Sequence, residues 1–407
     1  MGTPTPAAIG RLVTARALKE LTDGLVRLPA VTASGLWGSS VAAVTAAIEK
    51  NLNRPILLVC GHTDEVDDLA DDMELFHGRR PDVLPALELS GTLGQGSEEQ
   101  ASNRLALIHR MSQDAAEGDK PPMIVAPIQA LMQSVPSRQQ VGQLIRTLRV
   151  SQELEPEKLI VWLSEHGYNR LEQVEVPGDF AVRGGIIDIY IPGEFEQAGE
   201  QVGLTVRIDF FGDQIESIRQ FDLDSLGSRA PLESVRLMDL RGQLPETSDS
   251  THFLNFLPPD TIIILWAPLE IAEQAKSYLD RVPEVKGIYP LSALLQHAAR
   301  FTRLELSQFE QGAVSMTTLV GGRDIPNFRL PIGSLQKFET DANKAIYELA
   351  ALAATHEVTV FCENAGEYQR FGELIDQNQP GLRQKIDVPI GYLHRGFVWD
   401  ESITHEG

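Results

Sequence analysis

The amino-acid sequence predicts an α/β fold in which a parallel sheet, covered by helices, is interrupted by a β-rich insertion. Apolar runs of strand length occur at residues 55–60, 122–127 and 261–266, and each precedes a segment with the pattern of a helix. Strands that alternate with helices form parallel sheets covered on both faces. Residues 178–219 differ, because apolar and polar side chains alternate there as in a strand with one buried face.

The helices that belong to this sheet follow their strands closely. We expect helices at 64–74, 128–133 and 269–279, and a further helix–strand–helix unit at 341–354, 357–362 and 367–375. A helical or loosely held arm reaches to about residue 30, and an Ala-rich helix covers 41–50. Three strand–loop–helix units share one order, but no sequence repeat indicates a solenoid.

Length and composition indicate a soluble protein of several domains. The chain has 407 residues, of which 43% are hydrophobic, enough to bury a sizeable core. No apolar run approaches the roughly 20 residues of a membrane span, and the N-terminus lacks the features of a secretory signal. We therefore expect a cytoplasmic protein without a membrane partner.

The net charge and the positions of cysteine and histidine argue against a duplex-DNA-binding protein and a metal-binding protein. A net charge of −22 opposes the phosphate neutralisation on which duplex DNA binding depends. Cys60 and Cys362 each end an apolar run, which favours buried core thiols, although the sequence leaves a disulfide between them open. The nine histidines are scattered and no Cys/His cluster has zinc spacing, so we expect no metal.

A Gly/Ser loop lies where an ATPase of this fold would bind phosphate. Its residues are Gly35, Gly38, Ser39 and Ser40. A working P-loop needs a lysine for the β/γ-phosphates and a hydroxyl for magnesium. The corresponding Gly-Lys-Ser/Thr positions hold Ser40, Val41 and Ala42. The loop is therefore predicted to be a structural turn that binds no nucleotide cofactor.

The acidic segment 64–72 invites comparison with a magnesium site. Its carboxylates fall on the helix after the loop rather than at the end of the strand. Acidic residues are favoured at a helix N-terminus by the helix dipole, which accounts for the first of them. We predict a structural role.

The β-rich insertion presents arginines. Gly184 and Gly185 interrupt the strand beside Arg183 and allow another backbone to approach, and a hairpin turn is predicted at 212–213. Arginine is enriched at interface hot spots because its planar fork pairs with carboxylates and stacks on aromatic rings. A lone surface arginine is nevertheless usually a solvated side chain, and Arg207 and Arg219 are expected to pair with Asp209 and Glu216 across the hairpin.

The insertion also resembles a known family. Residues 180–189 read FAVRGGIIDI, residues 207–219 read RIDFFGDQIESIR, and residues 221–225 read FDLDS. These segments are similar to the UvrA-interaction domain of UvrB and of transcription-repair coupling factors (Mfd). The resemblance implies that Arg170 and Arg183 bind UvrA, with Phe180 and Gly184 beside them.

Further segments extend the resemblance toward the coupling factors. The loop GLWGSS at 35–40 is similar to their degenerate P-loop, and PIQALMQ at 127–133 is similar to the end of their first domain. GYLHRGF at 391–397 is similar to the close of their third domain. In the family, domains that bind RNA polymerase and duplex DNA follow, so we expect a fragment that lacks both contacts.

Resemblance and pattern together imply a degenerate RecA/helicase-like parallel-sheet domain, an inserted α+β domain and a small α/β domain. The expected segments are an arm at 1–30, the first half of the UvrB-like domain at 31–130, the UvrA-interaction domain at 131–222, the second half at 223–325 and the third domain at 326–407. Residues 241–261 are shorter than the family leads us to expect, which leaves the boundary near 310–330 open.

The expected function is that of a non-catalytic adaptor. It would bind UvrA and so recruit nucleotide excision repair to stalled RNA polymerase. Two alternatives stay open: a UvrB-type ATP-dependent repair subunit, and an unrelated α/β enzyme that uses the Gly35 loop for a phosphorylated ligand. Both predict nucleotide or ligand binding, which the adaptor does not.

Overall fold

The computed structural model describes residues 7–87, 95–113, 120–197, 200–223, 225, 227–241, 250–282, 286–309, 325–335 and 337–401. Within these residues, no helix combines the length and the apolar character needed to cross a bilayer.

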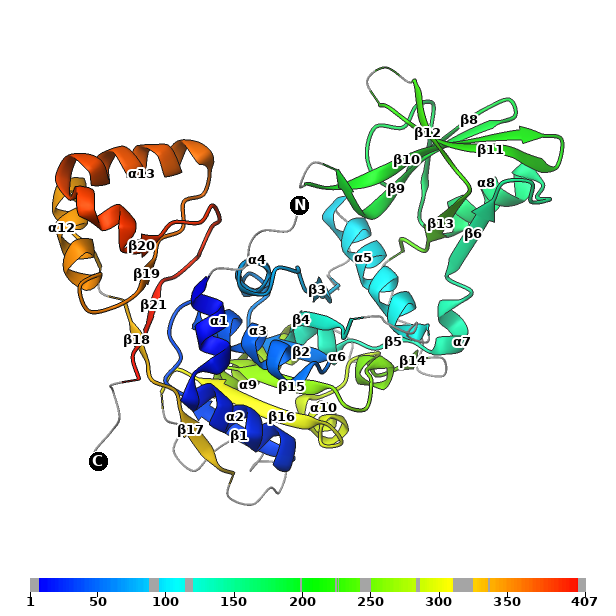
Figure 1. The fold of residues 1–407 in the computed structure, drawn as a ribbon. Helices are drawn as coiled ribbons and strands as arrows, with labels where there is room; N and C mark the ends of the chain where they lie inside the picture. The colour runs from blue at the N-terminus through cyan, green and yellow to red at the C-terminus, as the bar shows by residue number, and fades with distance from the viewer. Residues whose placement is uncertain are drawn as a thin grey trace.

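A seven-stranded sheet forms the centre of the molecule (Figure 1). Its strands, in spatial order, are β17 (Asn327–Arg329), β1 (Ala30–Ser34), β16 (Thr302–Ser307), β15 (Ile262–Trp266), β2 (Ile56–Cys60), β4 (Met123–Pro127) and β3 (Asp82–Val83). Every neighbouring pair is parallel. The predicted parallel α/β core is therefore confirmed.

Helices cover both faces of this sheet. One face packs against α1 (Ala7–Thr14), α2 (Arg16–Arg27), α3 (Ser40–Leu52) and α4 (Glu65–His77). The other packs against α5 (Gln95–Ser112), α6 (Ile128–Met132), η1 (Phe253–Phe256), α9 (Pro268–Arg281) and α10 (Leu291–Ala298). Side chains of β15 alternate between the two cores, since Ile262 and Ile264 belong to the first and Ile263 to the second.

The insertion is a second, six-stranded sheet set beyond α5 (Figure 1). Its spatial order is β12 (Ser228–Leu232), β11 (Gln214–Phe221), β10 (Glu200–Phe211), β9 (Ile186–Gln197), β8 (Asp179–Arg183) and β7 (Asn169–Leu171). Helix α8 (Pro156–Glu165) packs on one face through Leu159 and Leu163. Strands β6 (Ile145–Arg149) and β13 (Ser234–Met238) pair antiparallel and contribute to the same core.

Two details of the insertion correct the sequence interpretation. Gly184 and Gly185 do not interrupt a strand; they form the turn between β8 and β9, because Arg183 pairs with Ile186. The backbone that approaches is that of β10, whose Phe210 N–H donates to the Gly185 carbonyl over 2.7 Å. In β9 the polar positions are buried as well, since Asp188 is only 3% exposed. The predicted hairpin turn at 212–213 is present, with Phe211 paired to Gln214.

The C-terminal unit has its own small core. It contains α12 (Ala342–Leu352), β19 (Val358–Thr359), α13 (Ala365–Asn378), η2 (Pro380–Gln384) and β20 (Ile386–Asp387). The chain then returns to the main body, where β21 (Phe397–Trp399) pairs antiparallel with β18 (Ile332–Ser334), as Figure 1 shows.

Short elements complete the fold. They are β5 (Val135–Pro136), which pairs with β14 (Ser250–Thr251), and α7 (Arg138–Val141). Part of the stretch near 310–330, where the sequence leaves a domain boundary open, lies outside the described residues, as does Asp224 of the FDLDS motif.

Candidate protein-interaction surface

One face of the inserted sheet collects charged side chains. Along β10, Val206 and Ile208 are buried toward α8, so Arg207 and Asp209 point to the opposite side. The register places Asp188 and Arg219 opposite Arg207 on the neighbouring strands, on the same side. Arg183 lies two residues after Ala181, the β8 partner of Asp188. We call Arg183, Asp188, Arg207, Asp209 and Arg219 the charged face.

Two of its arginines are held by ion pairs. Arg207 donates to both carboxylate oxygens of Asp188, over 2.7 Å from Nε and 2.8 Å from Nη2, and this hydrogen bonding raises the pKa of Arg207. Arg219 donates to Asp209 over 2.6 Å. The Arg219–Asp209 pair lies across the hairpin as predicted, whereas Arg207 pairs with β9 rather than with either expected partner.

Arg183 is exposed and differs from both. Its Nη2 donates to the Glu172 carbonyl over 3.2 Å, and among the described residues no carboxylate lies within ion-pair distance of it. A Cβ built on the neighbouring Gly184, whose φ is +59°, meets nothing within 4 Å. The end of the β8–β9 hairpin therefore presents a cation to open space.

Arg170 is also exposed, but it lies on the other side of the sheet. It belongs to β7, the last strand in the sheet order, whose three residues are all exposed. Arg170 pairs with Phe180 and Leu171 with Ala181, so Leu171 rather than Arg170 points the same way as Arg183. The two predicted arginines thus flank the β7 edge of the sheet from opposite faces.

Phe180 does not form part of this surface. Its side chain is fully buried in the core beneath α8, because the alternation along β8 turns it inward. The exposed apolar side chains nearby are Leu171, 47% exposed, and Phe211, 78% exposed. Sequence analysis missed Phe211, although two consecutive phenylalanines before a tight turn cannot both face one core.

The Gly/Ser loop between β1 and α3 is closed by the chain itself. Gly35 and Gly38 have φ values of +93° and +55°. The Ser39 N–H donates to the Arg395 carbonyl over 3.0 Å, and the Arg395 N–H donates to Ser39 Oγ over 3.0 Å. A Cβ on Gly38 would lie 2.7 Å from the Gly396 carbonyl oxygen. The space above the start of α3 is therefore filled by backbone.

The acidic segment contributes to the same contact. His394 lies between Asp68, 3.0 Å from Nε2, and Asp72, 3.1 Å from Nδ1, and its N–H donates to Asp72 over 3.2 Å. Burial raises the pKa of the Asp72 carboxyl, although hydrogen bonds from Ser39 and His394 oppose this rise. The helix dipole alone does not account for the buried carboxylate of Asp72. In the sequence, the i,i+4 spacing of Asp68 and Asp72 is the pattern that could have indicated that both contact one residue.

Neither a metal cluster nor a reactive thiol emerges from the described residues. Groups of three or more His, Cys, Asp and Glu side chains that could hold a metal are absent from them. Cys60 and Cys362 are free and buried, and burial raises the pKa of both thiols. They are core residues without a disulfide.

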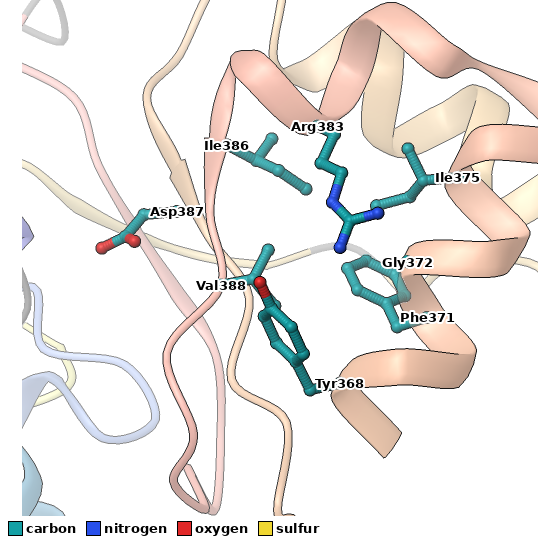
Figure 2. A pocket seen from close by; sticks show the side chains of 8 residues that line it. All are labelled: Tyr368, Phe371, Gly372, Ile375, Arg383, Ile386, Asp387 and Val388. Atoms are coloured by element: carbon teal, nitrogen blue, oxygen red, sulfur yellow. The ribbon is translucent and has the colours of Figure 1, made fainter. Parts of the chain in front are cut away.

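A cavity of about 210 Å³ lies in the C-terminal unit (Figure 2). It is lined by Tyr368, Phe371, Gly372, Ile375, Arg383, Ile386, Asp387 and Val388. The Arg383 guanidinium lies against Gly372, where a Cβ would come within 3.1 Å of Nη2, and Nη1 donates to Asp376 over 2.9 Å. Because Arg383 is already paired with Asp376, the cavity offers no uncommitted cation.

These observations define an α/β core that carries an inserted β-sheet module with a charged face. Residues 147–240, which include that module, match the family model of the UvrB interaction domain. This match and the relatives below support the resemblance to transcription-repair coupling factors.

The chain is 32% identical over 206 residues to the transcription-repair-coupling factor of Bacillus subtilis, covering 50% of this chain and 16% of that protein. It is 24% identical over 303 residues to the Escherichia coli factor, covering 69% of this chain and 25% of that protein. The Mycobacterium bovis factor is 31% identical over 173 residues, 42% of this chain and 13% of that protein. The chain thus spans a quarter or less of these relatives.

Proposed function

We propose that this chain is a non-catalytic adaptor that binds UvrA in the cytoplasm and links nucleotide excision repair to stalled RNA polymerase. The observation that carries the proposal is the unpaired, exposed Arg183 at the charged face of a module that matches the UvrB interaction domain. In the longer coupling factors, contacts to RNA polymerase and duplex DNA would belong to regions other than these 407 residues.

The proposed binding surface comprises Arg183, Arg170 and Leu171 at the β7 edge, with Gly184 leaving room for a partner. A carboxylate of UvrA can meet Arg183 without first breaking an existing ion pair, whereas Arg207 and Arg219 are committed to Asp188 and Asp209. Phe180 is excluded from the surface by its burial. Arg170 and Arg183 face opposite ways, so we propose that UvrA grips the edge rather than one flat face.

The absence of catalysis is part of the proposal. The loop after β1 lacks the P-loop lysine, and the backbone of Arg395 takes the Ser39 N–H that a phosphate would need. Both features support an adaptor over a UvrB-type ATP-dependent subunit or a nucleotide-binding enzyme.

The test is titration of purified UvrA with the chain and with Arg183→Glu. Reversing the charge should weaken binding by about 2–5 kcal/mol, which raises Kd at least about thirtyfold. Arg149→Glu is the matched control: Arg149 is also an exposed arginine of the insertion, on β6, and its variant should bind as the native chain does. Equal affinity of Arg183→Glu and the native chain would reject this surface. No binding by the native chain would reject the adaptor function.

A further inference from the structure

The segment that leaves the C-terminal unit crosses back over the main body. A Cβ on Gly391 would lie 2.5 Å from Leu75 Cδ1 of α4. Leu393 and Phe397 pack against the core beneath α3 and α4, and the Phe397 ring meets that of Phe76 at 6.1 Å. Residues 392–397, which we call the strap, thus lie against the same helices that frame the Gly/Ser loop.

The polar contacts of the strap are concentrated at two neighbouring residues. Arg395 exchanges hydrogen bonds with Ser39 through its N–H and its carbonyl. His394 contacts Asp68 and Asp72 of α4 through both ring nitrogens. The Tyr392 ring lies edge-on to the His394 ring at 4.8 Å.

His394 joins the strap to a buried carboxylate. Asp72 is only 3% exposed, and a buried carboxylate without a partner is strongly unfavourable. With the strap in place, the backbone and side chain of His394 both hydrogen-bond to Asp72. If the strap leaves, Asp72 keeps the hydrogen bond from Ser39 but loses both from His394, so water must replace His394 and the solvation of Asp72 is linked to the position of the strap.

The C-terminal unit has a hydrophobic core of its own. Its core consists of Ile346, Leu349, Ile375 and Leu382 and is separate from the main core. Other contacts also join it to the main body: an exposed ion pair between Arg11 and Glu357, an edge-on contact between Phe76 and Phe361 at 6.4 Å, the packing of Gly391 on Leu75, and the pairing of β21 with β18 directly after the strap.

We propose that residues 392–397 are a releasable strap, latched by His394 between Asp68 and Asp72, that holds the C-terminal unit on the main body and closes the Gly/Ser loop. Release uncovers the start of α3 and leaves the unit joined to the main body mainly through the β18–β21 pair. This device is independent of UvrA binding, because the insertion lies beyond α5 on another part of the molecule.

Hydrogen exchange of the whole chain tests the strap. In His394→Ala, the amides of Ser39 and Arg395 should exchange at least about tenfold faster than in the native chain, as expected for loss of a hydrogen bond to a charged group. Amides of β2, β15 and α13 should keep their native protection. His356→Ala is the matched control, since His356 is a half-buried histidine of the same unit that contacts its neighbour Thr355, and it should exchange as the native chain does.

The variant Asp72→Asn tests whether the hydrogen bonds to His394, rather than side-chain packing alone, hold the strap in place. An asparagine oxygen still accepts from His394 without burying a charge, so the Ser39 and Arg395 amides should stay protected, whereas Asp72→Ala should expose them. Native protection of both amides in His394→Ala would overturn the latch. If the amides of β2 and β15 also lose protection in that variant, the strap is part of the folded core, and the proposal that it is releasable is overturned.

Discussion

Three arginines lie on the charged face, and the residues around each one determine whether its guanidinium is free to bind a partner. Arg207 and Arg219 are held by carboxylates on adjacent strands, while Arg183 donates only to a backbone carbonyl among the contacts of the described residues. The sequence places Gly184 and Gly185 beside Arg183, but only the pairing of Arg183 with Ile186 shows that they form a turn rather than a break within a strand. The side of the sheet to which Arg170 points could not be predicted from the sequence, because it follows from the register of the three-residue strand β7 against β8.

His252 is a buried residue that sequence analysis did not single out. It is 1% exposed, and its ring stacks on His297 at 4.9 Å and lies 4.5 Å from Tyr289. Burial, with smaller contributions from His297 and Arg300, lowers the pKa of His252 to about 3. The native state therefore holds this histidine neutral at physiological pH.

We expect His252 to make stability depend on pH. The unfolded chain binds this proton near pH 6.5 and the native chain only near pH 3, so its contribution is present above pH 6.5 and is lost as pH falls toward 3. The loss should be about 1.4 kcal/mol per pH unit. Urea unfolding at pH 7, 6, 5 and 4 would measure it against His252→Phe, which cannot titrate. Parallel stability curves for the two proteins would contradict this assignment.

At the scale of elements, strands with uninterrupted apolar runs could be predicted and β16 could not. β2, β4 and β15 are buried on both faces, so their sequences carry a strong signal. β16 lies between β1 and β15 at the centre of the sheet, yet it contains Arg303 and Glu305, which are 9% and 3% exposed. A central strand with buried charges has the alternating pattern of a half-exposed strand, and this obscures its position.

Helix α5 contacts the main body through a buried arginine and the insertion through a serine. Arg104 is 3% exposed and donates to the carbonyls of Pro85, Ala130 and Gln133 over 2.8, 3.0 and 3.2 Å. On the insertion side, Ser102 Oγ donates to the Pro192 carbonyl of β9 over 2.9 Å. Burial lowers the pKa of Arg104 to about 10, so it remains charged at neutral pH.

We expect Arg104→Met to lower the free energy of unfolding by about 2–4 kcal/mol, because three buried carbonyls lose a donor. Arg110→Met on the same helix is the matched control. Arg110 forms a partly exposed pair with Asp82, and its loss should cost about 1 kcal/mol or less. Urea unfolding measures both variants, and equal losses would argue against a special role for Arg104.

At the scale of the whole molecule, composition predicted a chain of several parts, while contacts between distant segments could not be anticipated. Ser39 and Arg395 are 356 residues apart, and no local pattern at either position indicates the other. The prediction that the Gly/Ser loop binds no nucleotide rests on its missing lysine and hydroxyl. The contact between Ser39 and Arg395 is a separate observation, available only from the fold, that supports the same proposal.

We expect the whole chain to show no stabilisation by nucleotide. A ligand at one hundred times its Kd would stabilise the native state by about 2.7 kcal/mol. Thermal unfolding with millimolar MgATP should instead match unfolding with MgCl2 and sodium sulfate at equal ionic strength. A reproducible rise of the midpoint with MgATP alone would favour a nucleotide-binding protein.

The order of strands in the main sheet also determines when it can form during synthesis. β1 has β16 and β17 as its neighbours, and β2 lies between β15 and β4. Strand β1 therefore has no partner in the sheet until residues 302–307 have left the ribosome, although it precedes every other strand of this sheet in the chain. The insertion is complete well before that point. Because domains fold in the order in which their sequences emerge, the insertion should mature first, and the N-terminal helices must wait beside an unfinished sheet.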